Sequence, residues 1–471
     1  MVLIDWEKEA QRREGVIVRD VQALLKIKSV YDPSTIRPEA PFGEGIFQAL
    51  SYMLEKGKEA GFRTKNIDGY AGYIEFGEGK ECVGILCHLD VVPAGSGWTY
   101  APFCGTVQDG KIYGRGALDN KGPAVATYYA MKIVRDLGLP LKRRVRLILG
   151  CDEEREWRCV DYYFQKEEMP AVGFVPDADF PVIYAEKGIC DFIITYRAQK
   201  ENEISSLFTV QYLHAGERLN VVPDVGEALV YGERKHHEKL SETFQAFLKE
   251  NGLTGKINIE GESVRFFIYG VAAHGMEPEK GINAGLMLAK FLQTLNVDAA
   301  AKTFLTFVND YLADDTRGRK LGIAAKDQKL GDLTVNCGKI SYRRNEKGEI
   351  GLNIRYPASV NMENIVFQLQ SVVRSPFALK KLTHLPPHFV DENSMLIKTL
   401  KTVYERQTGQ KAELKAIGGG TYARALKEGV AFGPLFPHRQ DVAHEKDEHM
   451  YIGDLLKATS IYAEAIYELA K

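Results

Sequence analysis

The sequence contains no run of apolar residues that approaches the roughly 20 that a membrane-spanning helix needs. It also lacks a block of basic residues, because its 61 Lys and Arg residues are dispersed among 63 Asp and Glu residues, giving a formal net charge of -2. Proteins that follow a phosphate backbone rely on clustered positive charge. We therefore expect neither a membrane nor a nucleic acid as a partner.

Cysteine is scarce and unpaired in the sequence. The seven cysteines are odd in number, include no CxxC pair, and lie in several cases within apolar stretches. This pattern argues against a disulfide framework and against a thiolate zinc site, and suits reduced thiols. The first fifteen residues, "MVLIDWEKEAQRREG", lack the apolar core of a signal peptide, so we expect a cytoplasmic protein.

A length of 471 residues predicts two domains, or three. In the first part of the chain, stretches with helical periodicity alternate with short apolar runs. We expect helices over 5–28, 43–61, 158–168 and after Pro123, and strands over 71–76, 82–88, 144–150 and 172–176. This alternation predicts an α/β domain with a mixed, mainly parallel sheet flanked by helices.

From about residue 189 the pattern changes to β-runs such as "FIITYR", "VRFFIYG" and "EIGLNIRYP", with helical stretches between them. Helices are expected over 281–296, 304–313, 360–374, 394–408 and 450–470. We predict an α+β domain over 188–383, inserted into one α/β domain that is built from 1–187 and 384–471.

Polar residues follow the predicted strands of the first domain. In "LCHLDVVPAG", His88 and Asp90 are two residues apart and point to the same side of an extended chain, as in a metal ligand with a supporting carboxylate. Asp119 in "YGRGALDNKGP" is flanked by glycines that permit close backbone approach, although it also suits a helix N-cap. Further candidates are "GCDEE" (150–154), Asp177, and "DVAHEKDEHM" with His444 and His449.

Each of these motifs alone is typical of a solvated loop. Together they predict a site, because ligands of open α/β sheets gather at the carboxyl ends of the strands. Imidazole and carboxylate without thiolate suit zinc, manganese or cobalt. One carboxylate can bridge two cations about 3.5–4 Å apart, an arrangement that suits hydrolysis.

The order and spacing of "HLDVVPAGSGW", "DGKIYGRGALDNKGP", "DEE" and a late "HxxxE" resemble the co-catalytic metallopeptidases typified by carboxypeptidase G and aminoacylase. The insertion, "GGGTYAR" and "FGPLFP" are most similar to the bacterial peptidase V-type dipeptidases. The resemblance implies a catalytic domain with an inserted lid domain and two divalent ions, zinc first, with manganese or cobalt as alternatives. It also implies a cis peptide bond between Asp119 and Asn120.

The resemblance further implies roles for individual residues. Asp119 would bridge the ions, His88 and Asp177 would complete one metal site, and Glu154 and His444 the other. Glu153 would be the general base that takes a proton from a water held between the ions, without binding an ion itself, and Asp90 would orient His88.

In the lid domain, His274 of "YGVAAHGMEP" would stabilise the oxyanion, and Asn220 and Arg355 would hold the substrate. A surface-loop histidine and a structural salt bridge are the alternative interpretations of His274 and Arg355. The loop Gly418–Gly420, including Gly419, would line the other wall of the substrate-binding site together with Thr421 and Arg424. The sequence departs from the family pattern at Asn120, at Cys151 and in "HEKDE".

These residues predict an aminodipeptidase that hydrolyses the peptide bond of short, unblocked peptides. The alternatives are an N-acyl-amino-acid deacylase or desuccinylase on the same scaffold, and a homologue that binds peptides without cleaving them. Some relatives dimerise through the inserted domain. The insertion here is long enough to hold two similar halves, which would mimic a dimer within one chain and predict a monomer.

Overall fold

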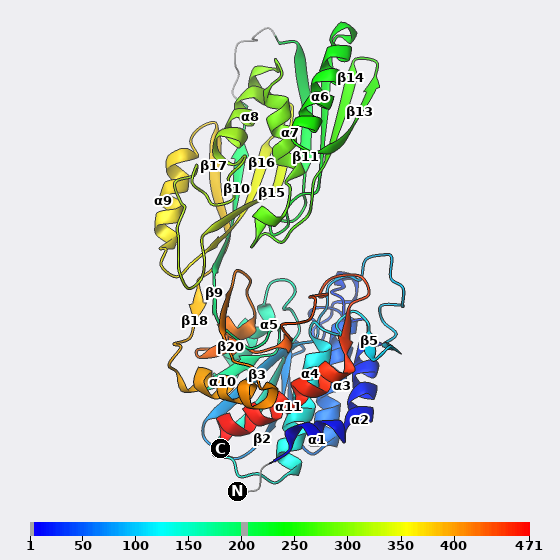
Figure 1. Ribbon diagram of the computed structural model, residues 1–471, viewed down its shortest axis with the longest axis vertical. Helices are drawn as coiled ribbons and strands as arrows, with labels where there is room; N and C mark the ends of the chain where they lie inside the picture. Colours follow the sequence, from blue (N-terminus) through cyan, green and yellow to red (C-terminus); the bar gives the residue numbers. More distant parts are fainter. Residues whose placement is uncertain (1–3, 199–205) are drawn as a thin grey trace. The chain divides into compact units, whose positions relative to one another are not determined.

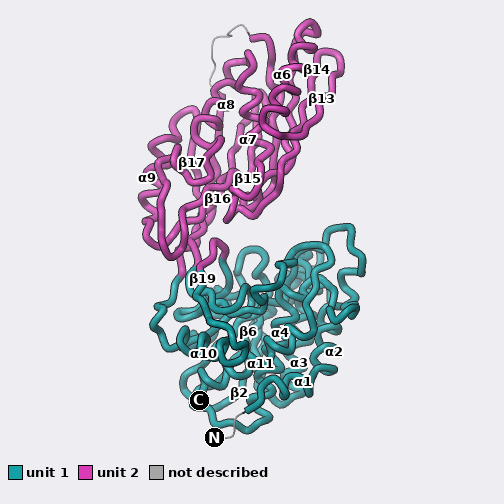
Figure 2. Tube along the Cα trace, in the orientation of Figure 1, with its two compact units in different colours: residues 1–185, 389–415, 420–471 teal, residues 186–388, 416–419 magenta. Residues whose placement is uncertain are grey.

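The computed structural model describes residues 4–198 and 206–471 of the chain. The chain forms two compact units, drawn in different colours in Figure 2. Unit 1 comprises residues 1–185, 389–415 and 420–471, and unit 2 comprises residues 186–388 and 416–419. Residues 384–388, which we expected in the final segment of the catalytic domain, belong to unit 2 because strand β17 (Phe377–Leu385) continues past the expected boundary as part of the unit 2 sheet.

Unit 1 is built on a mixed sheet with the strand order β1-β2-β6-β3-β7-β20-β9-β18, with β19 beside β9. The central strands β6, β3, β7 and β20 are parallel, whereas pairs toward both margins are antiparallel. The bounds are β1 Arg63–Ile67, β2 Ala71–Phe76, β3 Cys82–His88, β6 Arg144–Gly150, β7 Val172–Val175, β9 Val182–Glu186, β18 His388–Phe389, β19 Leu414–Ile417 and β20 Gly429–Ala431.

Helices flank this sheet (Figure 1). Their bounds are α1 Trp6–Gln11, α2 Glu14–Leu25, α3 Glu44–Glu59, α4 Lys121–Asp136, α5 Arg158–Lys166, α10 Met395–Thr408 and α11 Ile452–Ala470. Helices α4 and α11 pack against each other and against β3 and β6, and most of their residues are buried. The single helix expected over 5–28 is two helices. Between them, the backbone N–H groups of Arg13 and Val16 donate to carbonyls only three residues earlier, those of Ala10 and Arg13, which interrupts the α-helical pattern. Among the described residues, no helix has the length and apolar character needed to cross a membrane.

A small antiparallel sheet brings distant segments of unit 1 together. Strand β5 (Lys111–Tyr113) pairs with β4 (Thr106–Gln108) on one side and with β22 (His449–Tyr451) on the other. The C-terminal "HEKDE" segment therefore lies beside the glycine-rich segment that carries Asp119. Strands β8 (Ala178–Asp179) and β21 (Pro434–Leu435) form a further short parallel pair.

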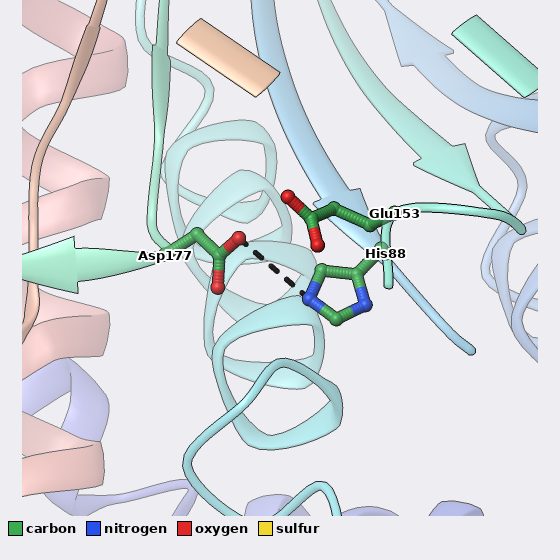
Figure 3. A group of neighbouring side chains, drawn as sticks. All are labelled: His88, Glu153 and Asp177. Atoms are coloured by element: carbon green, nitrogen blue, oxygen red, sulfur yellow. Dashed lines mark ion pairs between the residues drawn. The ribbon is translucent and has the colours of Figure 1, made fainter. Parts of the chain in front are cut away.

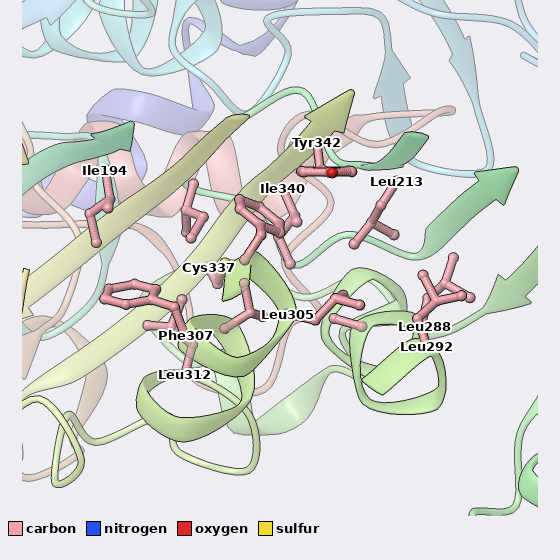
Figure 4. Packing of buried hydrophobic residues seen from close by; sticks show 14 of the residues in the cluster. Ile194, Leu213, Leu288, Leu292, Leu305, Phe307, Leu312, Cys337, Ile340 and Tyr342 are labelled. Carbon is pink, nitrogen blue, oxygen red and sulfur yellow. The ribbon is translucent and has the colours of Figure 1, made fainter. Parts of the chain in front are cut away.

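Unit 2 contains an antiparallel sheet with the order β13-β14-β12-β11-β15-β16-β10-β17. Its core lies between this sheet and the helices, and Figure 4 shows side chains of β10, β11 and β15 packed against those of α7 and α8. The bounds are β10 Gly188–Tyr196, β11 Phe208–Ala215, β12 Val225–Gly232, β13 Thr254–Glu260, β14 Ser263–Tyr269, β15 Thr334–Arg343, β16 Gly348–Tyr356, α6 His237–Glu250, α7 Ala284–Gln293, α8 Ala299–Tyr311 and α9 Met362–Val372. Short 3-10 helices cover Pro33–Thr35, Arg234–His236, Pro278–Lys280 and Tyr422–Ala425.

The sheet of unit 2 has a similar arrangement of four strands on each side of its centre, where β11 and β15 are neighbours. One half continues β11, β12, β14, β13, and the other continues β15, β16, β10, β17. Helix α6 joins the second strand of its half to the outermost one, as α9 does in the other half. The halves differ in connectivity, because β10 precedes the first half in the chain although it lies within the second.

Candidate metal centre

The parallel centre of the unit 1 sheet brings three of the predicted motifs together. His88 is the last residue of β3, Glu153 and Glu154 follow β6, and Asp177 follows β7. Figure 3 shows His88, Glu153 and Asp177 pointing toward one another. Candidate ligand atoms of these three residues lie within 4.8 Å of one another, and so do those of His88, Asp119 and Glu154. The same edge of the sheet therefore supplies two overlapping sets of donors.

The two carboxylate oxygens of Asp119 face two different histidines. Its Oδ1 lies 2.8 Å from Nε2 of His88, and its Oδ2 lies 3.0 Å from Nε2 of His444. The same His444 nitrogen lies 3.0 Å from Oε1 of Glu154, and Nε2 of His88 lies 3.6 Å from Oδ2 of Asp177. Asp119 thus stands between a His88 and Asp177 group and a His444 and Glu154 group.

Asp90 holds the turn after β6 rather than only the ring of His88. Its carboxylate oxygens accept the backbone N–H groups of Glu153 and Glu154 at 3.1 and 3.0 Å. Nδ1 of His88 lies 2.9 Å from the backbone carbonyl of Asp90 and 3.5 Å from its carboxylate. The third acid of the run has another use, because Asp152 accepts the backbone N–H of Arg158 at the start of α5.

The site combines partly buried carboxylates with two imidazoles, of which His88 is buried and His444 is half exposed. Burial raises the pKa of Asp177 to about 6 and that of Glu154 to about 7, and it raises the pKa of Glu153 well above its usual range. Burial also acts on Asp119, but its hydrogen bonds to His444 and His88 lower its pKa. Neighbouring carboxylates also raise the pKa values of Asp177, Glu154 and Glu153, and oxygen and nitrogen donors of this kind fit divalent cations.

Asn120 connects the loops that carry His88 and Asp177. Its Oδ1 accepts the backbone N–H of His88 at 3.2 Å, while Nδ2 donates to the Pro176 carbonyl at 2.5 Å and to Oδ1 of Asp177 at 3.0 Å. An aspartate could not make the last two bonds when ionised. The amide therefore explains the departure from an acid at this position. The peptide bond between Asp119 and Asn120 is cis, as expected.

The predicted substrate-binding residues are divided between the units. The loops of Asn220 and His274 lie side by side in unit 2, where Gly275 N–H donates to the Asn220 carbonyl at 2.7 Å. Arg355 is 4% exposed and donates to Asn353 and to the carbonyl of Gly418, at 2.8 and 3.0 Å. Gly418 and Gly419 belong to unit 2, whereas Thr421 belongs to unit 1 and caps a 3-10 helix.

Sequence reasoning gave no role to two buried residues beside the donors, Arg115 and Glu448. Their side chains form an ion pair at 2.6 Å and are 1% and 0% exposed. The "HxxxE" pattern marked Glu448, but nothing in the sequence pointed to Arg115 as its partner. His449, also noted in the sequence, donates a hydrogen bond from Nδ1 to the Asp447 carbonyl at 2.9 Å instead of joining the donor set.

Comparison with known proteins identifies the family of this chain. The model of peptidase family M20/M25/M40 matches residues 84–468. The chain belongs to this family. It is 48% identical over 470 residues to "Putative dipeptidase YtjP" of Bacillus subtilis (strain 168), covering 99% of this chain and 100% of the relative. It is 42% identical to "Putative dipeptidase" of Staphylococcus epidermidis, with coverage of 98% and 99%.

Solved structures of other proteins share the fold at low sequence identity. Human carnosine dipeptidase 1 matches with a TM-score of 0.56 and 15% identity, covering 98% of each chain. The dipeptidase Dug1p of Saccharomyces cerevisiae matches with a TM-score of 0.58 and 14% identity, covering 98% of this chain and 97% of the other. These matches support the mixed α/β fold of the family member described here.

Proposed function

We propose that this protein is a metal-dependent dipeptidase that hydrolyses the peptide bond of short peptides with a free amino group. The observation that carries the proposal is the position of Asp119, whose two oxygens lie 2.8 and 3.0 Å from two different histidines. Such a carboxylate suits a pair of ions rather than one. The names of the full-length relatives from B. subtilis and S. epidermidis support the substrate class.

The proposed cofactor is a pair of divalent ions, zinc first, with manganese and cobalt as alternatives. His88 and Asp177 would hold one ion, Glu154 and His444 the other, and Asp119 both. When bound, the ions would lower the pKa of water and polarise the carbonyl of the peptide bond.

We assign the role of general base to Glu153. Its partly buried carboxylate lies with His88 and Asp177, and Asp90 accepts its backbone N–H, so the group is held beside the donors. A buried glutamate has a raised pKa, which suits proton transfer near neutral pH. Glu153 would accept a proton from the attacking water and deliver it to the leaving amine.

For unit 2 we propose that His274 stabilises the oxyanion and that Asn220 and Arg355 hold the substrate, with Arg355 on its carboxylate. A planar guanidinium suits that group. Gly419 and Thr421 would contact the rest of the peptide. The matching outward order of the two halves supports a monomer in which one half replaces a partner chain. Seven free cysteines, six of them buried, support a cytoplasmic location.

A deacylase or desuccinylase would use the same donors, so the substrate must be tested directly. Elemental analysis of the purified protein should find two divalent ions per chain. A panel should then show hydrolysis of free dipeptides and little hydrolysis of N-acylated amino acids. The reverse preference would favour the deacylase, and two bound ions with no turnover on either class would favour the peptide-binding homologue.

A further inference from the structure

A buried ion pair links the two segments that carry Asp119 and His444. Nη1 of Arg115 lies 2.6 Å from Oε2 of Glu448. The Glu448 carboxylate also accepts hydrogen bonds from three backbone N–H groups of one short segment, those of Gly116 at 3.1 Å, Leu118 at 2.9 Å and Asp119 at 3.1 Å. One side chain thus holds the backbone of Asp119 itself and of the loop before it.

The same pair also holds the other segment. Nη2 of Arg115 donates to the backbone carbonyl of His444 at 3.0 Å, and the N–H of Gly114 donates to the carbonyl of Glu448 at 2.9 Å. The pairing of His449 with Tyr113 between β22 and β5 continues this connection. The backbone of His444 is therefore fixed to the loop that carries Asp119.

A charged pair so fully removed from water is costly unless each charge is well hydrogen-bonded, and breaking it leaves a charge without a partner. The Glu448 carboxylate meets this condition with a guanidinium and three backbone donors. Because these partners lie on a single loop, the carboxylate determines the backbone position from which Asp119 extends. Small displacements matter here, since the two oxygens of Asp119 must each face a histidine.

We propose that Arg115 and Glu448 are positioning residues that fix Asp119 against His444 and thereby set the affinity for the two ions. This inference rests on the metal centre proposed above. It predicts that Glu448→Gln weakens the binding of both ions, because Asp119 is shared between them. Arg115→Lys should weaken mainly one ion, because lysine keeps a charge for Glu448 but cannot also reach the His444 carbonyl.

The test is titration of the chelator-treated full-length protein with Zn²⁺ in competition with a chromophoric chelator. We expect two ions in the unchanged protein and an affinity about 10–100-fold lower for Glu448→Gln, the usual effect of losing a residue that orients metal ligands. Arg115→Lys should show one ion of nearly unchanged affinity and one weakened ion.

The matched control is Glu75→Gln. Glu75 pairs with Arg146 at 2.6 Å, with side chains 6% and 4% exposed, in the same unit. Glu75 accepts hydrogen bonds from Arg63, Arg144 and Arg146. The Glu75→Gln substitution should therefore lower the denaturation midpoint and leave the zinc affinity unchanged. A purely structural role for Glu448 would give the same result as this control.

Wild-type zinc affinity in Glu448→Gln, or an equal loss in Glu75→Gln, would overturn the inference. If Glu448→Gln does not fold, Arg115→Lys decides alone: selective weakening of one ion supports the inference, and unchanged affinity for both overturns it. Failure of the unchanged protein to bind two ions would instead contradict the metal centre itself, so the two failures are distinguishable.

Discussion

An oxygen of the Asp90 carboxylate accepts the backbone N–H of Glu153 at 3.1 Å, and the second oxygen accepts the next N–H along the chain. A residue that the sequence assigned to one histidine therefore also fixes the turn that presents two glutamates. The turn can present adjacent side chains to different neighbours, since Glu153 lies with His88 and Asp177 whereas Glu154 lies 3.0 Å from His444.

Substitution of Asp90 should disturb metal binding through this turn. In Asp90→Asn, an NH₂ group would face one of the two backbone donors, so we expect zinc affinity to fall about 10–100-fold. Competition titration with a chelator measures the change. Asp191→Asn is the control, because Asp191 also accepts two hydrogen bonds but lies in unit 2. Equal affinities in the two variants would contradict the role of Asp90.

The role of Glu153 predicts a separation between metal content and turnover. Glu153→Ala should keep two ions per chain by elemental analysis, while kcat falls by about 10²–10⁴-fold because the proton acceptor is lost. Glu156 is a nearby exposed residue, and the control variant Glu156→Ala should retain both the two ions per chain and the kcat of the unchanged protein. Retained activity in Glu153→Ala would remove it as the base, and loss of an ion would make it a ligand.

Arg355 offers a test between substrate binding and a structural role. Arg355→Lys should raise KM for dipeptides by about 10-fold or more with a smaller change in kcat, because lysine cannot bind a carboxylate with two parallel hydrogen bonds. Dipeptide amides, which lack that carboxylate, should show little difference between the two proteins. An unchanged KM together with a lower denaturation midpoint would establish a structural role.

The raised pKa values of Glu154 and Asp177, about 7 and 6, predict a pH dependence of stability in chelator-treated protein. The folded state holds protons on these carboxylates that the unfolded state has already released, so the stability from this source is present at low pH and declines as pH rises from about 4 to 7. Burial would lower the pKa of His444, but its contacts with Asp119 and Glu154 raise it to about 11. The stability of the folded state should therefore decline further as the pH rises above the ordinary pKa of histidine.

Thermal melting of chelator-treated protein over this range measures the effect, and Glu154→Gln should flatten it. Zn²⁺ must displace these protons, so calorimetry in buffers of different ionisation enthalpy should detect proton release on binding at neutral pH. If the Tm of the chelator-treated Glu154→Gln protein changed with pH as steeply as that of the unchanged protein, Glu154 would not be the source of the pH dependence.

Sequence patterns predicted the elements whose periodicity is strong. The strand 82–88 and the strand 144–150 have the predicted bounds, because both contain short apolar segments, "CVGILC" and "LIL", that are buried in the sheet. Strand β13 and helix α6 were missed, since β13 is a largely exposed strand and α6 follows a charged segment without a clear N-cap. The family resemblance supplied the roles of the metal donors, which are not readable from any one motif.

The contacts that hold the donors could not be predicted in the same way. Arg115 and Glu448 are 333 residues apart, and only the antiparallel pairing of β22 with β5 brings them together. Likewise, the two functions of Asp90 depend on backbone N–H groups, which every residue carries and which leave no trace in side-chain identity.

The first and last strands of unit 2 are hydrogen-bonded neighbours, with Ile189 opposite Leu385. The insertion therefore begins and ends at the same place on its own sheet. A gene that joined residue 185 to residue 389 through a short linker would remove residues 186–388 without having to bridge a wide gap. The excised segment, with its adjacent termini, is equally suited to transfer into another host or to being reconnected and opened at a different loop.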